Sequence, residues 1–180
     1  MRNDKKITKC IIPCRLSYLN CFRPVSINDG PEKYSVSAII PKNDTKTIYV
    51  IKEAIEQAKQ EYISKWGDKI PDDFSLPLRD GDVEKGEEET YKGCYYINAY
   101  SNYPPQVVNQ QVEPIKNESE IFSGCYGNIS VNFFPYNKNN SCGISAGLGN
   151  IQLVKLGETL GDRATAKDEF AVITEENFLS

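Results

Sequence analysis

The sequence contains no histidine, and only one methionine and one tryptophan occur among its 180 residues. Histidine is the side chain that most often transfers protons near neutral pH, and it is the commonest zinc ligand. Its absence argues against most hydrolytic enzymes and against the usual zinc sites. We therefore expect a protein without catalytic activity that requires no cofactor and no metal ion.

The cysteines do not show the spacing of a metal site. None of the six forms the Cys-x2-Cys pair that zinc ribbons use. Cys10, Cys14 and Cys21 are close in sequence, but a cluster built on them would need a fourth ligand from a distant part of the chain. Small, buried or half-buried reduced thiols are the favoured interpretation, and a metal cluster is the alternative.

Long hydrophobic runs are also missing. Pro13 and Arg15 interrupt the apolar stretch that follows the basic start, so the sequence shows neither a secretion signal nor a membrane-spanning segment. We expect a cytoplasmic protein that does not enter membranes.

Positive charge is in short supply and unevenly placed. The formal net charge is −4, which argues against a simple basic nucleic-acid binder. Residues 1–24 are basic, with six Lys and Arg against one Asp, whereas residues 79–89 carry six acids and residues 162–180 carry five acids against two bases. The chain is therefore segregated by charge, and a local basic surface remains compatible with its acidic total.

Hydrophobic periodicity predicts one strand and one helix in the first half of the chain. Residues 34–41 alternate in the manner of a strand that ends at a proline. From Thr45 to Trp66 the apolar residues recur at helical spacing, with Asn43 or Asp44 available as the N-cap and Gly67 as the stop signal. Residues 68–92 contain prolines, glycines and many acids, so we expect a loop there.

The pattern in the second half of the chain predicts β structure. We expect a strand at 94–100 that ends near Pro104, an extended segment from about Ile121 that continues through 125–134, and a Gly-rich strand pair at 143–157. A polar linker at 137–141 separates the last two. Several strands with one main helix, at about 45–66, predict a mainly β fold built as a barrel, not a βαβ repeat.

Two of these strands carry, on one face, residues that are unusual for a surface exposed to water. Tyr96, Asn98 and Tyr100 share one side of the strand at 94–100, and Tyr126, Asn128 and Phe134 share one side of the strand at 125–134. Aromatic rings interleaved with amides can form a platform on which unpaired bases stack, at roughly 1–3 kcal/mol per base. Packing of these rings beneath a loop or a helix is the alternative for each of them.

Charged and glycine-rich motifs complete the set of candidates. Lys33, Lys42 and Arg79 flank the predicted strands and are candidate phosphate contacts, although ordinary surface residues look the same. The PLRDGD motif places Asp80 and Asp82 around a glycine, which favours a turn over a divalent-metal site because the rest of a calcium loop is missing. The GLGN motif lacks a phosphate-loop lysine and favours a β-bulge or a flexible strand.

Five motifs carry a family resemblance, in this order: KYSVSAIIPK, PLRDGD, YYINAYS, FSGCYGNISVNFFPY and GISAGLGNIQLVKLGE. Over roughly residues 10–165 the chain resembles the bacteriophage OB-fold single-stranded DNA-binding proteins, long catalogued as a domain of unknown function. The resemblance implies a five-stranded OB barrel and sequence-tolerant binding of single-stranded DNA in phage replication or recombination, in the host cytoplasm. Where many relatives place basic residues, this chain has Tyr100 and Asn128, which favours stacking over charge.

The candidate DNA contacts are therefore the strand residues and cations already introduced, with Tyr103 and Tyr136 at the strand ends as further candidates. We expect an OB domain over residues 1–161, including a basic N-terminal lead-in, and an acidic tail over residues 162–180. Tail residues expected to bind replication or recombination proteins are Asp168, Glu169, Phe170, Glu175, Glu176 and Phe178. A phage structural or protein-interaction module using the same aromatic face is the alternative function, and the oligomeric state stays open between monomer and homodimer.

Overall fold

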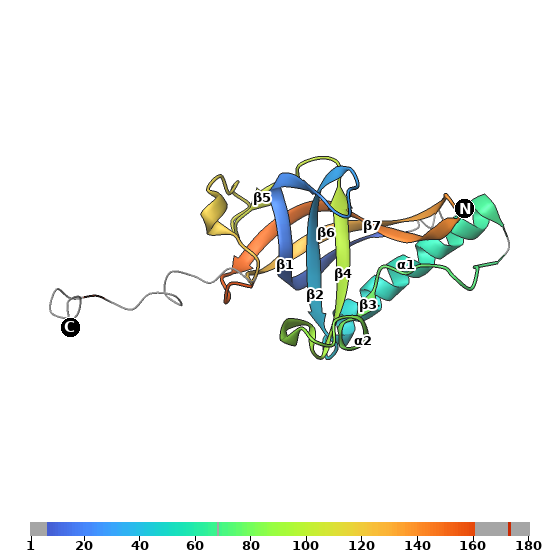
Figure 1. Ribbon diagram of the computed structural model, residues 1–180, viewed down its shortest axis with the longest axis horizontal. Coiled ribbons are helices and arrows are strands. Elements are labelled where there is room, and N and C mark those ends of the chain that lie inside the picture. The colour runs from blue at the N-terminus through green and yellow to red at the C-terminus, as the bar shows by residue number, and fades with distance from the viewer. Residues whose placement is uncertain (1–6, 68, 161–172, 174–180) are drawn as a thin grey trace.

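The computed structural model describes residues 7–67, 69–160 and 173 (Figure 1). Its elements are β1 (Lys9–Ser26), β2 (Glu32–Pro41), α1 (Thr45–Trp66), β3 (Arg79–Asp80), α2 (Gly81–Glu84), η1 (Glu89–Tyr91), β4 (Cys94–Ser101), β5 (Val107–Val108), η2 (Glu118–Glu120), β6 (Tyr126–Lys138) and β7 (Ser141–Lys155). None of the helices in these parts of the chain is long and apolar enough to span a membrane.

Strands β1, β2, β4, β7 and β6 form a closed barrel. Neighbouring strands pair antiparallel, except that β4 and β7 pair in parallel where Ala99 lies opposite Ala146. Strand β1 completes the ring because its first half pairs with β6 and its second half pairs with β2. Five strands closed into a barrel with one main helix confirm the mainly β architecture predicted from the sequence.

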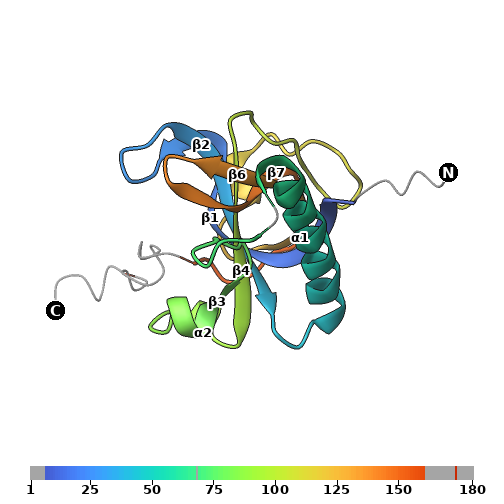
Figure 2. The same ribbon diagram turned by 90° about the vertical axis from the view of Figure 1, so that its right-hand side faces the viewer.

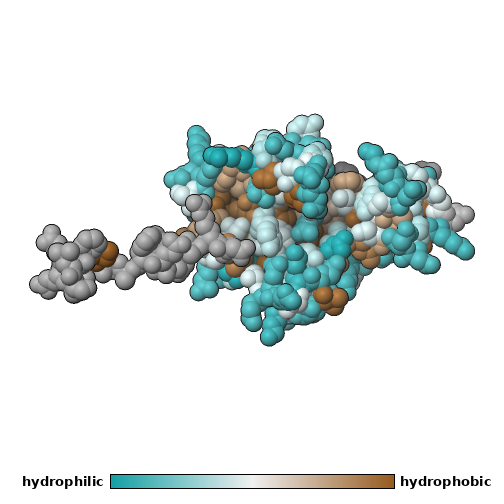
Figure 3. Space-filling model, in the orientation of Figure 1, coloured by the Kyte–Doolittle hydropathy of each residue, from teal (hydrophilic) through white to brown (hydrophobic). Residues whose placement is uncertain are grey.

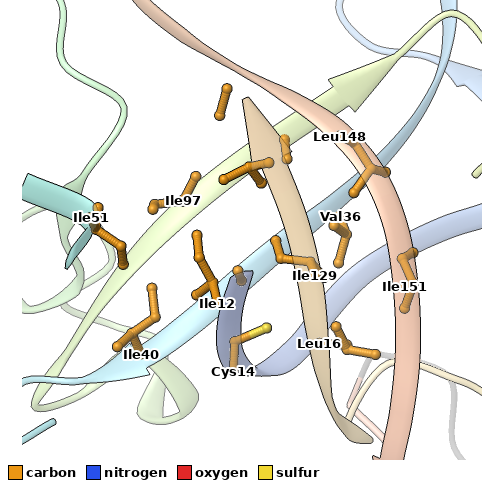
Figure 4. Packing of buried hydrophobic residues seen from close by; sticks show 14 of the residues in the cluster. Ile12, Cys14, Leu16, Val36, Ile40, Ile51, Ile97, Ile129, Leu148 and Ile151 are labelled. Atoms are coloured by element: carbon orange, nitrogen blue, oxygen red, sulfur yellow. The ribbon is translucent and has the colours of Figure 1, made fainter. Parts of the chain in front are cut away.

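Alternating apolar residues fill the barrel, as Figure 4 shows from close by. In β-strands successive side chains point to opposite faces, so every second residue of each strand enters the interior. The inward residues that are at most 2% exposed include Ile12, Leu16, Val36, Ile40, Ile97, Ile129 and Ile151. Each such aliphatic side chain stabilises the fold by roughly 1.5–3 kcal/mol through burial.

Helix α1 lies at one end of this barrel, and its bounds are those predicted from the sequence (Figures 1 and 2). The Asp44 side chain caps it by accepting a hydrogen bond from the Thr47 backbone N–H at 3.3 Å, and Gly67 follows its last residue. Its buried face, including Ile48, Ile51 and Ile55, packs into the same core as the barrel residues. The helix therefore closes the end of the barrel that the strands leave open.

The segment predicted as a loop at 68–92 is more ordered than expected, and that prediction is wrong for its second half. It contains β3, α2 and η1, and we call residues 81–93 the acidic strap. Tyr91 anchors the strap on the outer face of β2 and β4, because it is only 1% exposed and its hydroxyl lies 3.2 and 3.1 Å from the Oγ atoms of Ser17 and Ser37. The composition of this segment is that of a loop, and it did not indicate that Tyr91 would be buried and would hold the segment against the barrel.

Lys42 fastens the ends of the acidic strap to the end of β2. Its Nζ lies 2.8 Å from Asp80 Oδ1 and 2.7 Å from Asp82 Oδ2. Asp82 also accepts a hydrogen bond from the Gly93 backbone N–H at 2.9 Å, and Asp80 accepts one from the Asp82 N–H at 3.0 Å. The PLRDGD motif, for which the sequence favoured a turn, forms the end of β3 and the start of α2 with Asp80 as the N-cap, and its two carboxylates bind a lysine.

Strand β1, the longest strand, was missed because it lies in the part of the chain that was interpreted as a basic lead-in. Cys10, Ile12 and Cys14 point toward the core while Ile11 and Pro13 point outward. The alternation is hidden in the sequence because both faces of this stretch carry apolar residues. Only the pairing of β1 with β6 separates the two faces.

Strand β7 also differs from the sequence expectation, which predicted two strands in its place. It is one strand of 15 residues, and a bulge at Gly149 and Asn150 lets it continue, since Leu148 pairs with Val131 while Ile151 pairs with Ile129. The bulge confirms the interpretation of the GLGN motif.

The polar linker between β6 and β7 is a tight turn, in which Asn139 and Asn140 have φ values of 51° and 61°. The extended segment that was expected from Ile121 becomes a strand only at Tyr126.

The cysteines have the environments predicted for thiols. All six are free, four of them are buried, and Cys10 and Cys94 are half-buried. Burial raises the pKa of the Cys10 thiol to about 11 and that of Cys14 to about 12, so both are protonated at neutral pH. In the part of the chain that the structure describes, no group of three or more Cys, Asp or Glu side chains is arranged to hold a metal ion.

The attachment of the acidic strap gives a pH prediction. The Lys42 ammonium, hydrogen-bonded to both carboxylates, holds the pKa values of Asp80 and Asp82 below their usual range. A carboxylate with a lowered folded-state pKa stabilises the fold above its unfolded pKa, and this contribution is lost as the pH falls through the folded pKa. We expect Lys42→Gln to destabilise the protein near neutral pH, and the difference from wild type to shrink between about pH 5 and pH 2.

Urea unfolding of both proteins across this pH range measures the difference. Lys46→Gln, an exposed lysine on α1, is the matched control and should show no such pH dependence. A destabilisation by Lys42→Gln that is unchanged at low pH would contradict an ion-pair role for Lys42.

Candidate nucleic-acid interface

The strand register brings aromatic, amide and basic side chains together on one outer surface of the barrel. Residues that lie opposite each other in paired strands share a face, and Tyr126 lies opposite both Arg15 of β1 and Lys155 of β7. We call this surface the β1–β6–β7 face. Its residues are Lys9, Ile11, Pro13 and Arg15 from β1, Tyr126, Asn128, Ser130, Asn132 and Phe134 from β6, and Gln152 and Lys155 from β7.

Tyr126 lies at one end of this face between two cations. Its side chain is 36% exposed. The Lys155 Nζ lies 4.7 Å from the ring centroid, and the Arg15 guanidinium carbon lies 5.4 Å from it. Such cation–π contacts contribute about 0.5–1 kcal/mol at exposed sites. A planar apolar surface and two positive charges are thus available within one small area.

An apolar groove of about 540 Å³ adjoins Tyr126. Pro13, Arg15 and Asn128 line it on one side, and Ile39 of β2 and Val154 of β7 contribute apolar surface. A ring or a base that lay against Tyr126 would therefore meet further apolar surface in this groove, and not only water.

Amide and hydroxyl groups occupy the middle of the face. Asn128 Nδ2 donates a hydrogen bond to Gln152 Oε1 at 3.1 Å, across β6 and β7. The Ser130 Oγ accepts one from the Asn150 backbone N–H at 2.8 Å, at the bulge. The Gln152 Nε2 also lies 3.4 and 3.5 Å from the carbonyl oxygens of Asn109 and Gln110. An amide side chain has two donors and an acceptor with two lone pairs, so Asn128 keeps a donor and its oxygen for a ligand, and Gln152 keeps one lone pair of its oxygen.

Phe134 lies toward the other end of the face and is 42% exposed. Its ring packs beside Gly147, where an added Cβ would come within 3.4 Å of ring atom Cε1. A groove of about 500 Å³ runs next to it and is lined by Lys9, Ile11 and Asn132 among others. The ring is thus supported from below by a glycine and remains open to solvent on the outside.

The prediction that Tyr96 presents its ring to solvent is wrong. Tyr96 is only 4% exposed, because the acidic strap covers it. Its ring packs edge-on against Tyr91, with the centroids 5.2 Å apart, and the Lys85 Nζ lies 5.9 Å from its centroid. Burial raises the pKa of the Tyr96 hydroxyl. Figure 3 shows that the lower part of the molecule, where α2 lies, is mostly hydrophilic around one small hydrophobic patch, so the strap replaces an aromatic surface by a mainly acidic one.

The other predicted aromatic and amide residues are less central. Asn98 and Tyr100 are half-buried on the outer face of β4, and Tyr100 lies opposite Gly147 of β7, which places it next to the β1–β6–β7 face. Tyr103 is 79% exposed in the loop after β4. Tyr136 is half-buried on β6, beyond Phe134, with its hydroxyl close to Gly143.

The predicted phosphate contacts are mostly in ion pairs, and the cations of the interface are different ones. Lys42 binds Asp80 and Asp82, and Arg79 Nη1 lies 2.8 Å from Glu84 Oε1. Lys33 is half-buried near the start of β2. The cations on the face are Lys9, Arg15 and Lys155, of which the first two belong to the basic segment at 1–24 and none was among the predicted phosphate contacts. If β1 had been recognised as a strand, the alternation of its side chains would have placed Lys9 and Arg15 on the outer face.

The predicted tail residues, Asp168, Glu169, Phe170, Glu175, Glu176 and Phe178, lie outside the residues that the structure describes. The described chain reaches Leu160, whose backbone N–H donates to the Ser123 carbonyl at 2.8 Å. The Glu158 carbonyl accepts a hydrogen bond from Arg15 Nη2 at 3.0 Å. Residues 158–160 therefore lie beside Arg15 and Ser123, at the Tyr126 end of the β1–β6–β7 face.

Comparisons with known proteins show which proteins this chain is similar to. Protein p50 of Acyrthosiphon pisum secondary endosymbiont phage 1 is 31% identical over 183 residues, which cover 92% of this chain and 95% of that protein. The single-stranded DNA-binding protein of bacteriophage Enc34, solved in complex with single-stranded DNA, superposes with a TM-score of 0.76 at 24% identity, covering 86% of this chain and 90% of that one.

A more distant structural likeness is to gp2.5, a single-stranded DNA-binding protein of bacteriophage T7. The TM-score is 0.55 at 15% identity, covering 88% of this chain and 99% of that chain. At such identities the superpositions support the fold alone, and they confirm the OB-type barrel predicted from the sequence. The family model described as Enterobacter phage Enc34, ssDNA-binding protein, matches residues 6–179. Because that match spans nearly the whole chain, the chain belongs to this family of phage single-stranded DNA-binding proteins.

Proposed function

We propose that this chain binds single-stranded DNA on the β1–β6–β7 face, as a non-enzymatic protein of phage DNA replication and recombination. The observation that carries the choice of face is the exposed Tyr126 ring flanked by Arg15 and Lys155. Membership of a single-stranded DNA-binding family supports the ligand. We place the protein in the host cytoplasm, where it would meet replicating phage DNA.

Stacking would supply the part of the affinity that does not depend on sequence. Every base has a π-face, so a base that leaves water to lie on Tyr126 or Phe134 gains roughly 1–3 kcal/mol whichever base it is. Both rings are on strands of a rigid barrel, which limits the entropy that they lose on binding. Asn128 and Gln152, between the two ends, would bond to base edges or to the sugar-phosphate backbone.

The length of the face sets the smallest site. Tyr126 and Phe134 are eight residues apart on β6, which corresponds to about 26 Å at the rise of an extended strand. OB folds bind about 4–16 nucleotides of single strand. Two aromatic platforms at this separation would suit a strand of several nucleotides with bases held at both ends and polar contacts between.

The distribution of charge explains how an acidic protein could bind a polyanion. The β1–β6–β7 face contains Lys9, Arg15 and Lys155 and no acidic residue. The acids of the strap, including Glu84 and Glu88, lie over the outer face of β2 and β4 instead. Local potential, rather than net charge, steers a charged ligand to a surface, so DNA would be attracted to the one face and repelled from the other.

The acidic tail would compete for the same face. Glu158, four residues before the tail segment, lies beside Arg15. Residues 162–180 carry five acids and two bases together with Phe170 and Phe178. An aromatic ring next to carboxylates offers the same two kinds of group as a nucleotide. We propose that this tail occupies the face in the absence of DNA and binds replication or recombination proteins once DNA has displaced it.

The stacking platform can be tested by substitution. We expect Tyr126→Ala and Phe134→Ala each to weaken binding of a single-stranded oligonucleotide by roughly 1–3 kcal/mol, because the ring is lost. Tyr126→Phe should retain most of the affinity, since its ring remains. Fluorescence anisotropy titration with a labelled oligonucleotide, with circular dichroism to monitor the fold, provides the measurement.

Two further variants serve as controls. Tyr49→Ala removes an aromatic ring on α1 that is 65% exposed and away from the face, and it should bind like wild type. Tyr96→Ala should act on stability instead, lowering the free energy of unfolding by about 3–5 kcal/mol through the cavity that it leaves. Wild-type affinity in both the Tyr126→Ala and the Phe134→Ala variant would show that DNA binds elsewhere.

The tail is tested by truncation. A chain that ends at Gly161 should bind single-stranded DNA more tightly than the full chain, with the largest gain at low salt, where screening is weakest. A chain that ends at Thr174 loses only Glu175, Glu176 and Phe178 of the tail candidates, so its gain should have the same sign and a smaller size. Titrations at several salt concentrations measure both. If neither truncated chain binds more tightly at low salt, the tail does not compete for the DNA site.

A further inference from the structure

The chain that follows β7 crosses the loop that precedes β6 at a very short backbone distance. Gly124 has a φ of 116°, a conformation that favours glycine, and an added Cβ there would come within 2.8 Å of the Glu158 carbonyl carbon. An added Cβ on Gly157 would lie 2.9 Å from the Cε2 atom of the Tyr126 ring. We call this contact between Gly124 and residues 157–160 the glycine crossing. It requires a glycine on each of the two segments.

Hydrogen bonds fix the glycine crossing on both sides. The Leu160 N–H donates to the Ser123 carbonyl at 2.8 Å, and the Gly124 N–H donates to the Leu16 carbonyl at 2.7 Å. The segment of residues 157–160 is therefore attached to the loop before β6, and that loop is attached to β1. The crossing thus has a defined position relative to the strand that carries Arg15.

Arg15 bonds to both segments of the crossing. Its Nε donates to the Gly124 carbonyl at 3.1 Å, and its Nη2 donates to the Glu158 carbonyl at 3.0 Å. A guanidinium has five N–H donors, so three remain for a ligand. A long arginine side chain on an outer strand face would otherwise sample many rotamers. The two carbonyls hold it beside the Tyr126 ring before any ligand arrives.

We infer that the glycine crossing positions Arg15 to contact a DNA phosphate next to a base stacked on Tyr126. This inference rests on the proposed function and adds a role for Gly124, Gly157 and Leu160, which do not themselves contact the DNA. They act through Arg15 and are positioning residues. The segment between β7 and the tail is then part of the binding site, although it lies beyond the last strand of the barrel.

Electrostatic repulsion alone predicts the opposite change in DNA affinity when this segment is loosened. Residues 156–160 contain one acid, Glu158, and no base, so loosening them from the DNA face would reduce repulsion and strengthen binding. If the segment orders Arg15, loosening it weakens binding. The direction of the change therefore distinguishes a positioning role from a simple charge effect.

The test is a double-mutant cycle in the full-length chain. We expect Gly157→Ala to weaken binding of a labelled oligo-dT by on the order of five- to tenfold, the loss of one phosphate contact, and to reduce the slope of log Kd against log salt by about 1. In an Arg15→Gln background the same change should have no further effect, because the residue through which it acts is gone. Combined with Lys155→Gln, a direct contact on the other side of Tyr126, its effect should be additive.

A second variant and a control separate positioning from misfolding. Leu160→Pro removes the N–H that bonds to Ser123 without adding atoms near Tyr126, and it should reproduce the loss of affinity and the change in salt slope. Gly86→Ala, in the acidic strap, is the glycine control and should bind as wild type does. Thermal unfolding of every variant shows that the barrel is retained.

The possible outcomes test the positioning role of the glycine crossing separately from the proposed DNA face. Unchanged or tighter binding by both Gly157→Ala and Leu160→Pro, while Arg15→Gln weakens binding, overturns the positioning role and leaves the DNA face intact. An equal loss from Gly157→Ala with and without Arg15 also overturns it. Wild-type binding by Arg15→Gln and Lys155→Gln alike overturns the proposed DNA face, and the positioning role with it.

Discussion

The double pairing of β1 is the interaction on which the rest of the structure depends. Its first half pairs with β6 and its second half with β2, so this one strand closes the barrel. Closure fixes which side of each strand is inside, because side chains alternate along a strand. It places Ile12 and Leu16 in the core, and it places Pro13 and Arg15 on the outer surface beside Asn128 and Tyr126. The fold and the proposed DNA face are therefore consequences of the same register.

The acidic strap makes the two outer sides of the barrel unlike. Over β2 and β4 it buries Tyr96 beneath Tyr91 and Lys85 and presents acids to solvent. Over β1, β6 and β7, residues 157–160 touch one edge of the Tyr126 ring, but none of the described segments buries Tyr126 or Phe134, which remain 36% and 42% exposed. The strap thus removes Tyr96 from the solvent-exposed surface, whereas Tyr126 and Phe134 stay accessible. Lys42, bound to Asp80 and Asp82, contributes to this asymmetry by fastening the strap.

The features that local sequence determines were predicted well. The bounds of α1 follow from a periodic apolar face, a cap at Asp44 and a stop at Gly67, all within one stretch of chain. The outward face of β6 follows from alternation, which is why Tyr126, Asn128 and Phe134 lie where the sequence placed them. The GLGN bulge follows from the low cost of irregular backbone at glycine.

The features that depend on distant contacts were not predicted. Nothing near Tyr96 in the sequence shows that a segment anchored by Tyr91 will cover it, since that burial depends on Ser17 and Ser37 of other strands. Lys42 and Arg79 looked available because their acidic partners, some of them far away in sequence, could not be assigned. Arg15 gained its role only when the pairing of β1 placed it opposite Tyr126.

If unpaired bases lie on Tyr126 and Phe134, photochemical crosslinking will detect the contact between base and ring. An oligonucleotide that carries 5-iodouracil forms covalent bonds on irradiation with aromatic side chains that stack on the modified base, and mass spectrometry of the digested protein identifies them. We expect crosslinks to Tyr126 and Phe134 and none to Tyr96 or Tyr49. Crosslinks confined to residues outside the β1–β6–β7 face, such as Tyr49 on α1, would contradict this expectation.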